Sequence, residues 1–475
     1  HMKINRFMIA APKSGSGKTM ITCALLQLLK DNGKNVSSYK CGPDYIDPMF
    51  HKKVLGVPSK NLDTFFTDEK TTVQLFLDER ADGDFAVLEG VMGLYDGLGG
   101  IYEQGSSYHL AKVTQTPIIL VVDAKGMGKS VLALIAGFLQ YDTQHLIKGV
   151  LLNRMSKGYY DIIKPLIEKK LSVKVVGYFP EQKDIGLSSR YLGLVMPDEL
   201  SDIKKQLNET ADRLKKTIDM DLLKDIAAEA DEIGDSENAD VYNEKSIGNC
   251  DQNEFSQNKA INTVNIAVAM DEAFCFYYED NLRLLEKCGS KLQYFSPLHD
   301  TELPDNCDAL LLGGGYPELY AKELSENISM RKSIKTAFEA GLPTVAECGG
   351  FMYLHTYIHN QNCVFDMAGV LDGWCHFKGK LVRFGYIELE EKNSNFLPSD
   401  EKIRAHEFHY YDSTDNGTDC IATKPATGRK YDCVISRDNY WLGFPHIYYP
   451  SNPHFAENFV KKAQEYERNK NGKLL

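Results

Sequence analysis

The sequence has no excess of basic residues, no long apolar run and no signal-peptide pattern. Lys and Arg total 54 against 66 Asp and Glu, a net charge of −12, and no basic stripe or cluster offsets it. This balance argues against a nucleic-acid-binding protein, so anionic ligands must be bound at local sites. No apolar run reaches the ~18 residues of a membrane span. We therefore expect a cytoplasmic protein that binds neither membrane nor nucleic acid.

Paired cysteine motifs and internal repeats are also lacking. The eleven cysteines include no C-x-x-C pair and are scattered through the chain, which favours reduced thiols over a disulfide framework or a zinc site. Each is expected to be a small buried hydrophobic residue, and Cys348 alone departs from that expectation. A chain of 475 residues is too long for one ordinary core, so two or three domains are expected.

The glycine that opens a standard phosphate loop is absent too, because Pro12 stands at its position. The rest of the pattern is present: an apolar run, the turn AAPKSGSGKT over residues 10–19, and a helix-like run. Such a turn points backbone N–H groups and the positive end of a helix at one spot, which suits a polyphosphate. Lys18 is expected to neutralise phosphates and Thr19 to hold Mg²⁺; a plain Gly/Ser turn is the alternative.

This turn resembles the deviant phosphate loop of dethiobiotin-synthetase and MinD-like ATPases. The resemblance implies that a second, upstream lysine also reaches the phosphates. The predicted ATP-binding residues in the turn are Lys13, Ser14, Gly15, Ser16, Gly17, Lys18 and Thr19.

Polar side chains follow several predicted strands. The strand over residues 36–39 leads into a loop with Asp44 and Asp47, and the strand over 85–88 ends at Glu89. Carboxylates at the carboxyl edge of a sheet are placed to hold Mg²⁺ or to meet a substrate. An ordinary Asp-Pro turn and a solvated loop acid are the alternatives. Asn153, at the end of a later strand, is predicted to contact an adenine edge.

Strands alternate with helices through the first half, which predicts a mostly parallel, doubly wound sheet. From residue 229 to 262 the chain is rich in Asp, Glu, Asn, Ser and Gln and has few large apolar residues, as in an exposed linker. We therefore expect an α/β protein with domains at residues 1–228 and 263–475 and a linker at 229–262.

The second half contains a candidate nucleophile. Cys348 follows an apolar strand and precedes two glycines, so we expect a sharp turn that exposes the sulfur at a helix start and lowers the pKa of the thiol. His446 supplies the distant histidine of a Cys–His enzyme. Gly314 and Gly315, after the strand over 309–312, are predicted to donate to an oxyanion. A buried structural cysteine and a structural histidine are the alternatives.

A second histidine cluster lies in the stretch RAHEFHY over residues 404–410. Its hydrogen-bonding groups alternate with Phe408, which indicates a strand whose polar face meets an anionic ligand. His406 and His409 are the candidate residues.

The order of these features resembles the cobyrinate a,c-diamide synthase family. The motifs that carry the resemblance are SGSGKT at residues 14–19, GPDYIDP at 42–48, EGVMGLYDG at 89–97, GGGYPE at 313–318, ECGG at 347–350 and HEFHY at 406–410. The resemblance implies a carbon–nitrogen ligase, with a dethiobiotin-synthetase-like ATP-dependent domain joined to a class I, triad-type glutamine amidotransferase domain.

The resemblance also implies the partners and further site residues. The substrates are L-glutamine and cobyrinic acid, a corrin polycarboxylate amidated on its a and c side chains through a phosphorylated carboxylate; ATP and Mg²⁺ are the cofactors, and a homodimer is allowed for. Substrate contacts are assigned to Asp44, Tyr45, Asp47, His406 and His409, and metal contacts to Thr19, Asp44 and Glu89.

Some questions stay open at this point. Related amidotransferases carry a Glu two residues after the catalytic His, but Tyr448 stands there, so the third triad member is not identified. The motifs also fit the equivalent diamidation of nickel sirohydrochlorin or hydrogenobyrinic acid. A MinD-like ATPase switch with an inert second domain is the alternative from another class.

Overall fold

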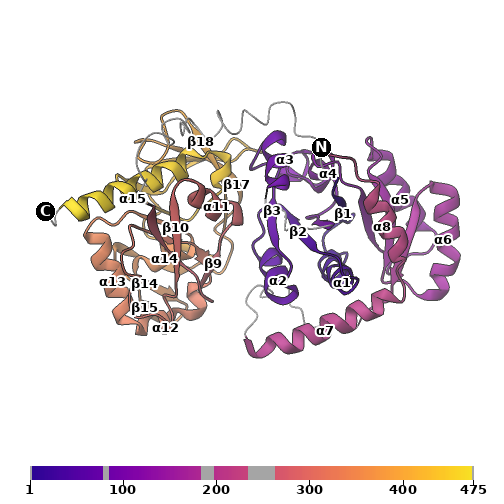
Figure 1. The fold of residues 1–475 in the computed structure, drawn as a ribbon, viewed down its shortest axis with the longest axis horizontal. Helices are drawn as coiled ribbons and strands as arrows, with labels where there is room; N and C mark the ends of the chain where they lie inside the picture. Colours follow the sequence, from indigo (N-terminus) through magenta and orange to yellow (C-terminus); the bar gives the residue numbers. More distant parts are fainter. Residues whose placement is uncertain (1–2, 79–84, 183–196, 234–262, 473–475) are drawn as a thin grey trace. The chain divides into compact units, whose positions relative to one another are not determined.

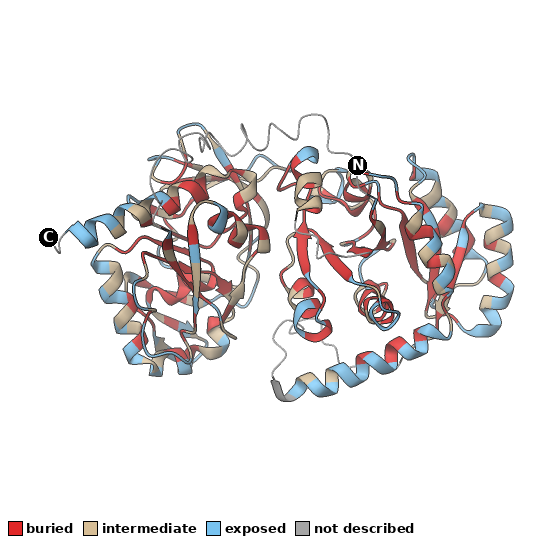
Figure 2. Cartoon of the chain, viewed as in Figure 1, coloured by how far each residue is buried: buried red, intermediate tan, exposed pale blue. Residues whose placement is uncertain are grey.

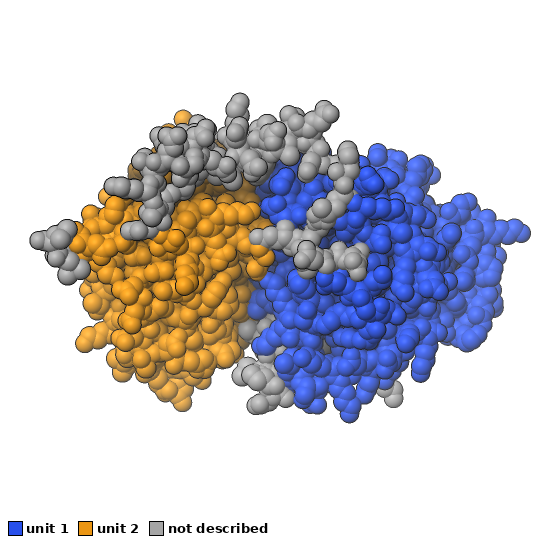
Figure 3. Space-filling model, in the orientation of Figure 1, with its two compact units in different colours: residues 1–236 blue, residues 237–475 orange. Residues whose placement is uncertain are grey.

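The computed structural model describes residues 3–78, 85–182, 197–233 and 263–472. The chain divides into two compact units, residues 1–236 and 237–475 (Figure 3). Each unit has its own central sheet and its own hydrophobic core (Figures 1 and 2).

Seven parallel strands form the sheet of the first unit, in the order β3-β2-β4-β1-β5-β6-β7. Because β1 is central and the chain winds outward from it to both edges, the predicted doubly wound sheet is confirmed. The strands are β1 (Asn5–Ala10), β2 (Val36–Cys41), β3 (Ser59–Leu62), β4 (Phe85–Glu89), β5 (Ile118–Asp123), β6 (Ile147–Asn153) and β7 (Lys174–Phe179).

Helices cover both faces of this sheet (Figure 1). Side chains alternate along a strand, so Phe7 of β1 packs on one face and Met8 on the other. The first face is covered by α1 (Lys18–Asp31), α2 (Ile46–Leu55), α7 (Pro197–Lys215) and α8 (Met220–Ala228). The second is covered by α3 (Glu69–Leu77), α4 (Ser107–Val113), α5 (Ser130–Tyr141) and α6 (Lys157–Leu171).

Strand β3 has the polar sequence SKNL and was not predicted. It is buried because neighbouring chain satisfies its polar groups. Asn61 donates to the carbonyls of Gly42 (2.9 Å) and Asp44 (2.6 Å), and the Ser59 hydroxyl accepts from Ser38 (2.7 Å). These bonds tie the edge strand to the acidic loop that follows β2.

The second unit contains a six-stranded sheet in the order β10-β8-β11-β13-β23-β22, parallel except for the edge strand β22. Helices α11 and α15 pack on one face and α12, α13 and α14 on the other. The strands are β8 (Val264–Ala269), β10 (Ser290–Phe295), β11 (Ala309–Leu312), β13 (Thr344–Glu347), β22 (Ile435–Arg437) and β23 (Tyr440–Gly443). The helices are α11 (Glu279–Lys287), α12 (Ala321–Glu326), α13 (Ile328–Glu339), α14 (Gly349–Tyr353) and α15 (His454–Gly472).

Three smaller sheets complete this unit: β12-β9, β15-β14-β16-β19 and β21-β20-β17-β18-β24. Only β18 among their strands was predicted as a strand. Their bounds are β9 (Phe274–Phe276), β12 (Gly314–Gly315), β14 (His355–Asn360), β15 (Cys363–Asp366), β16 (Leu371–Phe377), β17 (Arg383–Glu391), β18 (Lys402–His409), β19 (Tyr411–Ser413), β20 (Cys420–Thr423), β21 (Lys430–Cys433) and β24 (His446–Ile447).

The first residues of the predicted linker pack on the first unit. Ala230 and Ile233 are buried, and the Arg6 guanidinium donates to the carbonyl of Asp231 at 2.8 Å. The rest of the predicted linker, residues 234–262, lies outside the described residues. The ten cysteines in the described ranges are free thiols. Among the helices of those ranges, none is long and apolar enough to cross a membrane.

Candidate functional site

The phosphate loop joins β1 to α1 and is contacted by Asn153, the last residue of β6. Gly17 caps α1 with a φ of 95°, a left-handed conformation that favours glycine. Asn153 donates from Nδ2 to the carbonyl of Ser16 at 2.9 Å, and the Ser16 hydroxyl donates to the carbonyl of Lys13 at 2.8 Å. A Cβ on Gly17 would lie 2.3 Å from Nδ2 of Asn153. The structure therefore places Asn153 against the loop backbone; its predicted adenine contact stays a prediction.

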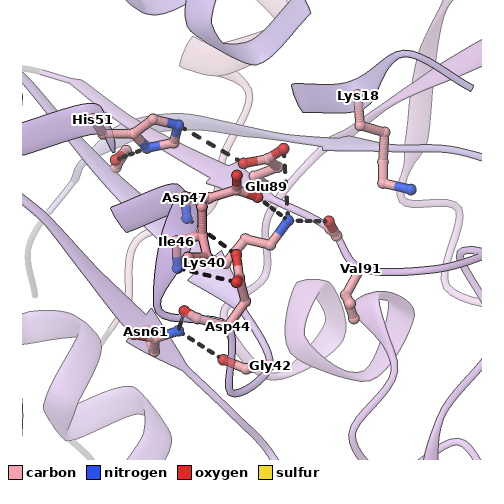
Figure 4. A network of polar contacts seen from close by, with 12 residues as sticks. Lys18, Lys40, Gly42, Asp44, Ile46, Asp47, His51, Asn61, Glu89 and Val91 are labelled. Atoms are coloured by element: carbon pink, nitrogen blue, oxygen red, sulfur yellow. Dashed lines mark hydrogen bonds and ion pairs between the residues drawn. The ribbon is translucent and has the colours of Figure 1, made fainter. Parts of the chain in front are cut away.

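Lys18 is the buried cation of this loop. Its Nζ donates to the carbonyl of Met92 at 2.7 Å, and Figure 4 shows it pointing away from the neighbouring acidic residues. Burial, and then the nearby Lys40, lowers the pKa of Lys18 to about 8. Lys13, Ser14 and Gly15 are exposed, whereas Ser16 is buried like Lys18.

A buried ion-pair cluster lies at the carboxyl ends of β2 and β4 (Figure 4). Nζ of Lys40 lies 2.8 Å from Oδ2 of Asp47 and 3.6 Å from Oε1 of Glu89, and it donates to the carbonyl of Gly90 at 3.3 Å. Burial disfavours the charge of Lys40, but Glu89, Asp47 and Asp44 together raise its pKa above the ordinary value. The pKa of Asp47 is lowered, since Lys40 outweighs the opposing effect of burial.

Glu89 has the features expected of a metal-binding carboxylate. It is 1% exposed, and its oxygens lie beyond hydrogen-bond distance of both Lys40 and His51. Burial, and then Asp47, raises its pKa to about 8, and the Thr19 side chain opposes that rise. Nε2 of His51 lies 3.8 Å from Oε2, and burial lowers the pKa of His51 to about 4. A buried carboxylate beside a hydroxyl suits Mg²⁺, a cation that prefers oxygen ligands.

The described residues contain no preformed cluster of three or more His, Cys, Asp or Glu able to hold a metal ion. Mg²⁺ in phosphate sites commonly takes only one or two carboxylates, with phosphate oxygens and water as its other ligands. The donor set around Glu89 and Thr19 is of that kind.

Asp44 shapes the acidic loop. Its carboxylate accepts the N–H groups of Ile46 (3.0 Å) and Asp47 (3.1 Å) and so begins α2. Burial, and then Asp47, raises the pKa of Asp44 to about 6. Tyr45 is buried. The predicted contacts of Asp44 and Tyr45 with metal or substrate stay predictions.

In the second unit, Cys348 lies on a sharp turn between β13 and α14. Its φ and ψ are 44° and −104°, and its N–H donates to the carbonyl of Gly443 at 2.9 Å. A Cβ on Gly349 would lie 3.1 Å from N of Gly315, and one on Gly350 would lie 2.1 Å from the carbonyl oxygen of Leu312. The predicted turn is therefore confirmed. Its two glycines lack side chains, which lets the turn lie against β12 at Gly315 and against β11 at Leu312.

The sequence-based expectations for the thiol were wrong. Cys348 is 8% exposed, and burial, and then Glu318, raises the pKa of its thiol above the ordinary value. The start of the short helix α14 does not compensate for this desolvation. To act as a nucleophile, this buried thiol would need a base to take its proton.

His446, the predicted base, lies near this turn. A Cβ on Gly314 would lie 2.5 Å from Cε1 of His446, so the glycine strand packs against the imidazole. Nδ1 of His446 lies 4.0 Å from Oε2 of Glu347. Burial, and then His406 and His409, lowers the pKa of His446 to about 3. The fold thus gathers Cys348, His446 and the two predicted oxyanion glycines in one place.

His406 and His409 lie on opposite faces of β18, so they do not share the single polar face that was predicted. His406 pairs in register with His446, with ring centroids 6.4 Å apart. His409 is buried, stacks on Phe444 at 3.9 Å and donates from Nδ1 to the carbonyl of Tyr411 at 2.7 Å. Their predicted substrate contact stays a prediction.

Comparison with known proteins matches both units. Residues 7–192 match the CobQ/CobB/MinD/ParA nucleotide binding domain, and residues 265–452 match the CobB/CobQ-like glutamine amidotransferase domain. The chain is 37% identical over 467 residues to the cobyrinate a,c-diamide synthase of Caldanaerobacter subterraneus, covering 97% of this chain and 99% of that protein. The chain belongs to the cobyrinate a,c-diamide synthase family. It is an enzyme, a glutamine-dependent amidotransferase of the ligase class.

Other members of the cobyrinate a,c-diamide synthase family match over similar lengths. The synthase of Listeria innocua is 36% identical, with 95% of this chain and 97% of that protein covered. The synthase of Clostridium acetobutylicum is 37% identical, with 96% and 99% covered. The chain therefore spans both functional domains of these family members.

Sequence reasoning about this family member missed Lys40, His51 and Glu347. Lys40 carried a usable signal, because a lysine at the end of a buried strand needs carboxylate partners. Glu347 lies beside the nucleophile in sequence, but its approach to His446 depends on β13 and β24, which are about a hundred residues apart. His51 gave no signal.

Proposed function

We propose that this chain catalyses the ATP- and glutamine-dependent amidation of the a and c side-chain carboxylates of cobyrinic acid. The observation that carries the proposal is the full-length similarity to cobyrinate a,c-diamide synthases, together with one candidate site in each unit. The phosphate loop is assigned to the synthetase half and the cysteine turn to the glutaminase half.

In the glutaminase half, Sγ of Cys348 attacks the amide carbon of glutamine and passes its proton to His446. N–H groups of Gly314 and Gly315 stabilise the oxyanion. The C–N bond breaks as His446 returns the proton to the leaving nitrogen, which releases ammonia. Water then hydrolyses the thioester, so glutamate leaves and the thiol is restored.

In the synthetase half, the γ-phosphoryl group of ATP is transferred to a substrate carboxylate. Ammonia attacks the acyl carbon, the amide forms and inorganic phosphate leaves. Lys18, with Lys13 and the loop N–H groups, binds the polyphosphate. Thr19 and Glu89, with Asp44 close by, are the residues that would hold Mg²⁺, which supplies charge neutralisation when polyphosphate meets polycarboxylate.

A reciprocal pair of variants tests this division. Cys348→Ser should abolish glutamine-driven amidation yet keep ammonia-driven amidation, because free ammonia bypasses the cysteine site. Lys18→Ala should lose both amidations by about a hundredfold or more while glutamine hydrolysis survives, because one preorganised phosphate contact is gone. Lys170→Ala, an exposed lysine at the end of α6, is the matched control. Equal loss of both amidations in Cys348→Ser would contradict the two-site assignment.

The macrocycle is tested by direct competition. The purified enzyme is given cobyrinic acid, hydrogenobyrinic acid and nickel sirohydrochlorin, and the diamide is measured by mass spectrometry. A higher yield of diamide from hydrogenobyrinic acid or nickel sirohydrochlorin would show that cobyrinic acid is not the preferred substrate. Glutaminase activity separates all three from a MinD-like switch, which would release no ammonia. A cytoplasmic location and a homodimer remain predictions.

A further inference from the structure

A carboxylate approaches the proposed catalytic histidine from an unusual position in the chain. Glu347 directly precedes Cys348, and its Oε2 lies 4.0 Å from Nδ1 of His446. Its Oε1 accepts a hydrogen bond from the backbone N–H of Ile447 at 3.4 Å. This bond links the carboxylate to β24, the strand that carries His446. Both side chains are buried.

The position two residues after His446 does not supply a carboxylate. Tyr448 stands there, 2% exposed, and its hydroxyl donates to Oδ2 of Asp280 on α11 at 3.1 Å. The phenol is thus engaged with a different element. A third group for the Cys–His pair has to come from elsewhere in the fold.

We propose that Glu347 is the positioning residue for His446, in place of a carboxylate after the histidine. Oε2 of Glu347 faces Nδ1 at an ion-pair distance of 4.0 Å and favours the proton on that nitrogen, which leaves Nε2 to take the proton of Cys348. When that proton arrives, the imidazolium lies next to a carboxylate. The inference rests on the proposed function, because it assumes that Cys348 and His446 carry out glutamine hydrolysis.

The surroundings of the pair disfavour a charge on either member alone. His446 pairs in register with His406 of β18, packs against the uncharged Gly314 of β12 and is approached by Glu347 from β13, while His409, on the other face of β18, also lowers its pKa. Burial raises the pKa of Glu347 to about 8, with Tyr277 and Tyr449 near it. Each charge is costly by itself in this buried place, and opposite charges 4.0 Å apart offset one another.

Glu347→Gln in the full-length enzyme tests the inference, because it removes the charge and keeps the volume. Glutamine-driven turnover should fall about a hundredfold or more, with the KM for glutamine changed by less than about threefold. The pH midpoint of Cys348 alkylation by iodoacetamide should rise by about one unit or more, because the imidazolium loses its partner. Glu347→Asp should restore part of the turnover, since it restores the charge.

Glu391→Gln is the matched control. Glu391 is another buried carboxylate of the second unit, and it accepts from the N–H of Phe396 (2.9 Å) and the hydroxyl of Ser436 (2.7 Å). Its substitution therefore measures the effect of losing a buried carboxylate that does not approach His446. The inference is overturned if Glu347→Gln keeps the turnover and alkylation midpoint of this control. It is also overturned if glutamine- and ammonia-driven rates fall together with thermal stability. Glutaminase activity in Cys348→Ser would instead reject the proposed function itself.

Discussion

At the scale of single residues, the ion pair of Lys40 and Asp47 connects stability to the synthetase site. Both side chains are buried, and their charged atoms are 2.8 Å apart. Glu89, the next carboxylate, lies farther from the ammonium, at 3.6 Å. Removing Asp47 leaves the buried ammonium with only the more distant carboxylates opposite it, and breaking a buried pair commonly costs about 3 kcal/mol.

Asp47→Asn should therefore lower the free energy of unfolding of the first unit by about 3 kcal/mol. Urea unfolding followed by circular dichroism measures this loss. Asp44→Asn is the comparison, because it leaves the Lys40–Asp47 pair in place; it removes a weaker electrostatic effect on Lys40 and one hydrogen bond to the start of α2, the latter about 1 kcal/mol. Equal stability of the two variants would show that the ion pair contributes little.

The same two variants separate folding from catalysis. Asp44→Asn should still lower amidation turnover by roughly a hundredfold, if its carboxylate meets metal or substrate in the transition state. Steady-state rates with ammonia as the nitrogen donor measure this without the glutaminase site. A near wild-type rate would leave Asp44 with the structural role that its backbone hydrogen bonds already give it.

At the scale of elements, the phosphate loop depends on β6. Gly17 and Gly15 both have positive φ, but only a Cβ at Gly17 meets a neighbour, Nδ2 of Asn153 at 2.3 Å; nothing lies within 4 Å of a Cβ at Gly15. Gly15→Ala and Gly17→Ala therefore differ in whether the added methyl group meets Asn153.

Gly17→Ala should weaken binding of a non-hydrolysable ATP analogue at least about tenfold more than Gly15→Ala does. The reason is that Gly15→Ala carries only the cost of a left-handed alanine, roughly 1–2 kcal/mol, whereas Gly17→Ala also displaces Asn153 from the Ser16 carbonyl. Isothermal titration calorimetry measures both affinities. Adding Asn153→Ala to Gly17→Ala should recover part of the loss if the clash is its cause, and no recovery would argue against this coupling.

At the scale of the whole molecule, the two units can be followed separately. Both tryptophans, Trp374 and Trp441, lie in the second unit, so tryptophan emission reports on that unit alone. His355 offers a pH probe there, since it is 1% exposed, bonds to the carbonyl of Phe351 and the hydroxyl of Ser413, and has its pKa lowered to about 4 by burial.

A folded-state pKa below the unfolded value means that the unfolded chain binds the extra proton. The stability linked to His355 is therefore complete above about pH 6.5 and is lost as the pH falls toward 4, at about 1.4 kcal/mol per unit. His355→Gln should flatten the pH dependence of the second unit by that amount, measured by urea unfolding at pH 7, 6 and 5. The slope of unfolding free energy against pH is compared between His355→Gln and the unsubstituted chain, because the slope does not include the pH-independent cost of the substitution. Equal slopes would contradict the prediction.

The parallel sheet of the first unit could be predicted from local pattern, because its strands are apolar runs buried on both faces and separated by helical periods. The phosphate loop and the cysteine turn could be predicted as well, since both depend on glycines at fixed local spacing. Polar β3 and the small sheets of the second unit were missed, because their burial depends on partners such as Asn61 with Gly42 and not on local pattern.

Which distant side chains meet depends on how the whole chain packs. Cys348 and His446 were found as separate motifs, but the contact of Glu347 with His446 arises where β13 and β24 come together. The burial that raises the thiol pKa of Cys348 is likewise a property of packing, opposite to what its helix-start position predicts. Local sequence fixes backbone turns through sterics within a few residues, whereas desolvation and charge pairing depend on what the rest of the chain brings alongside.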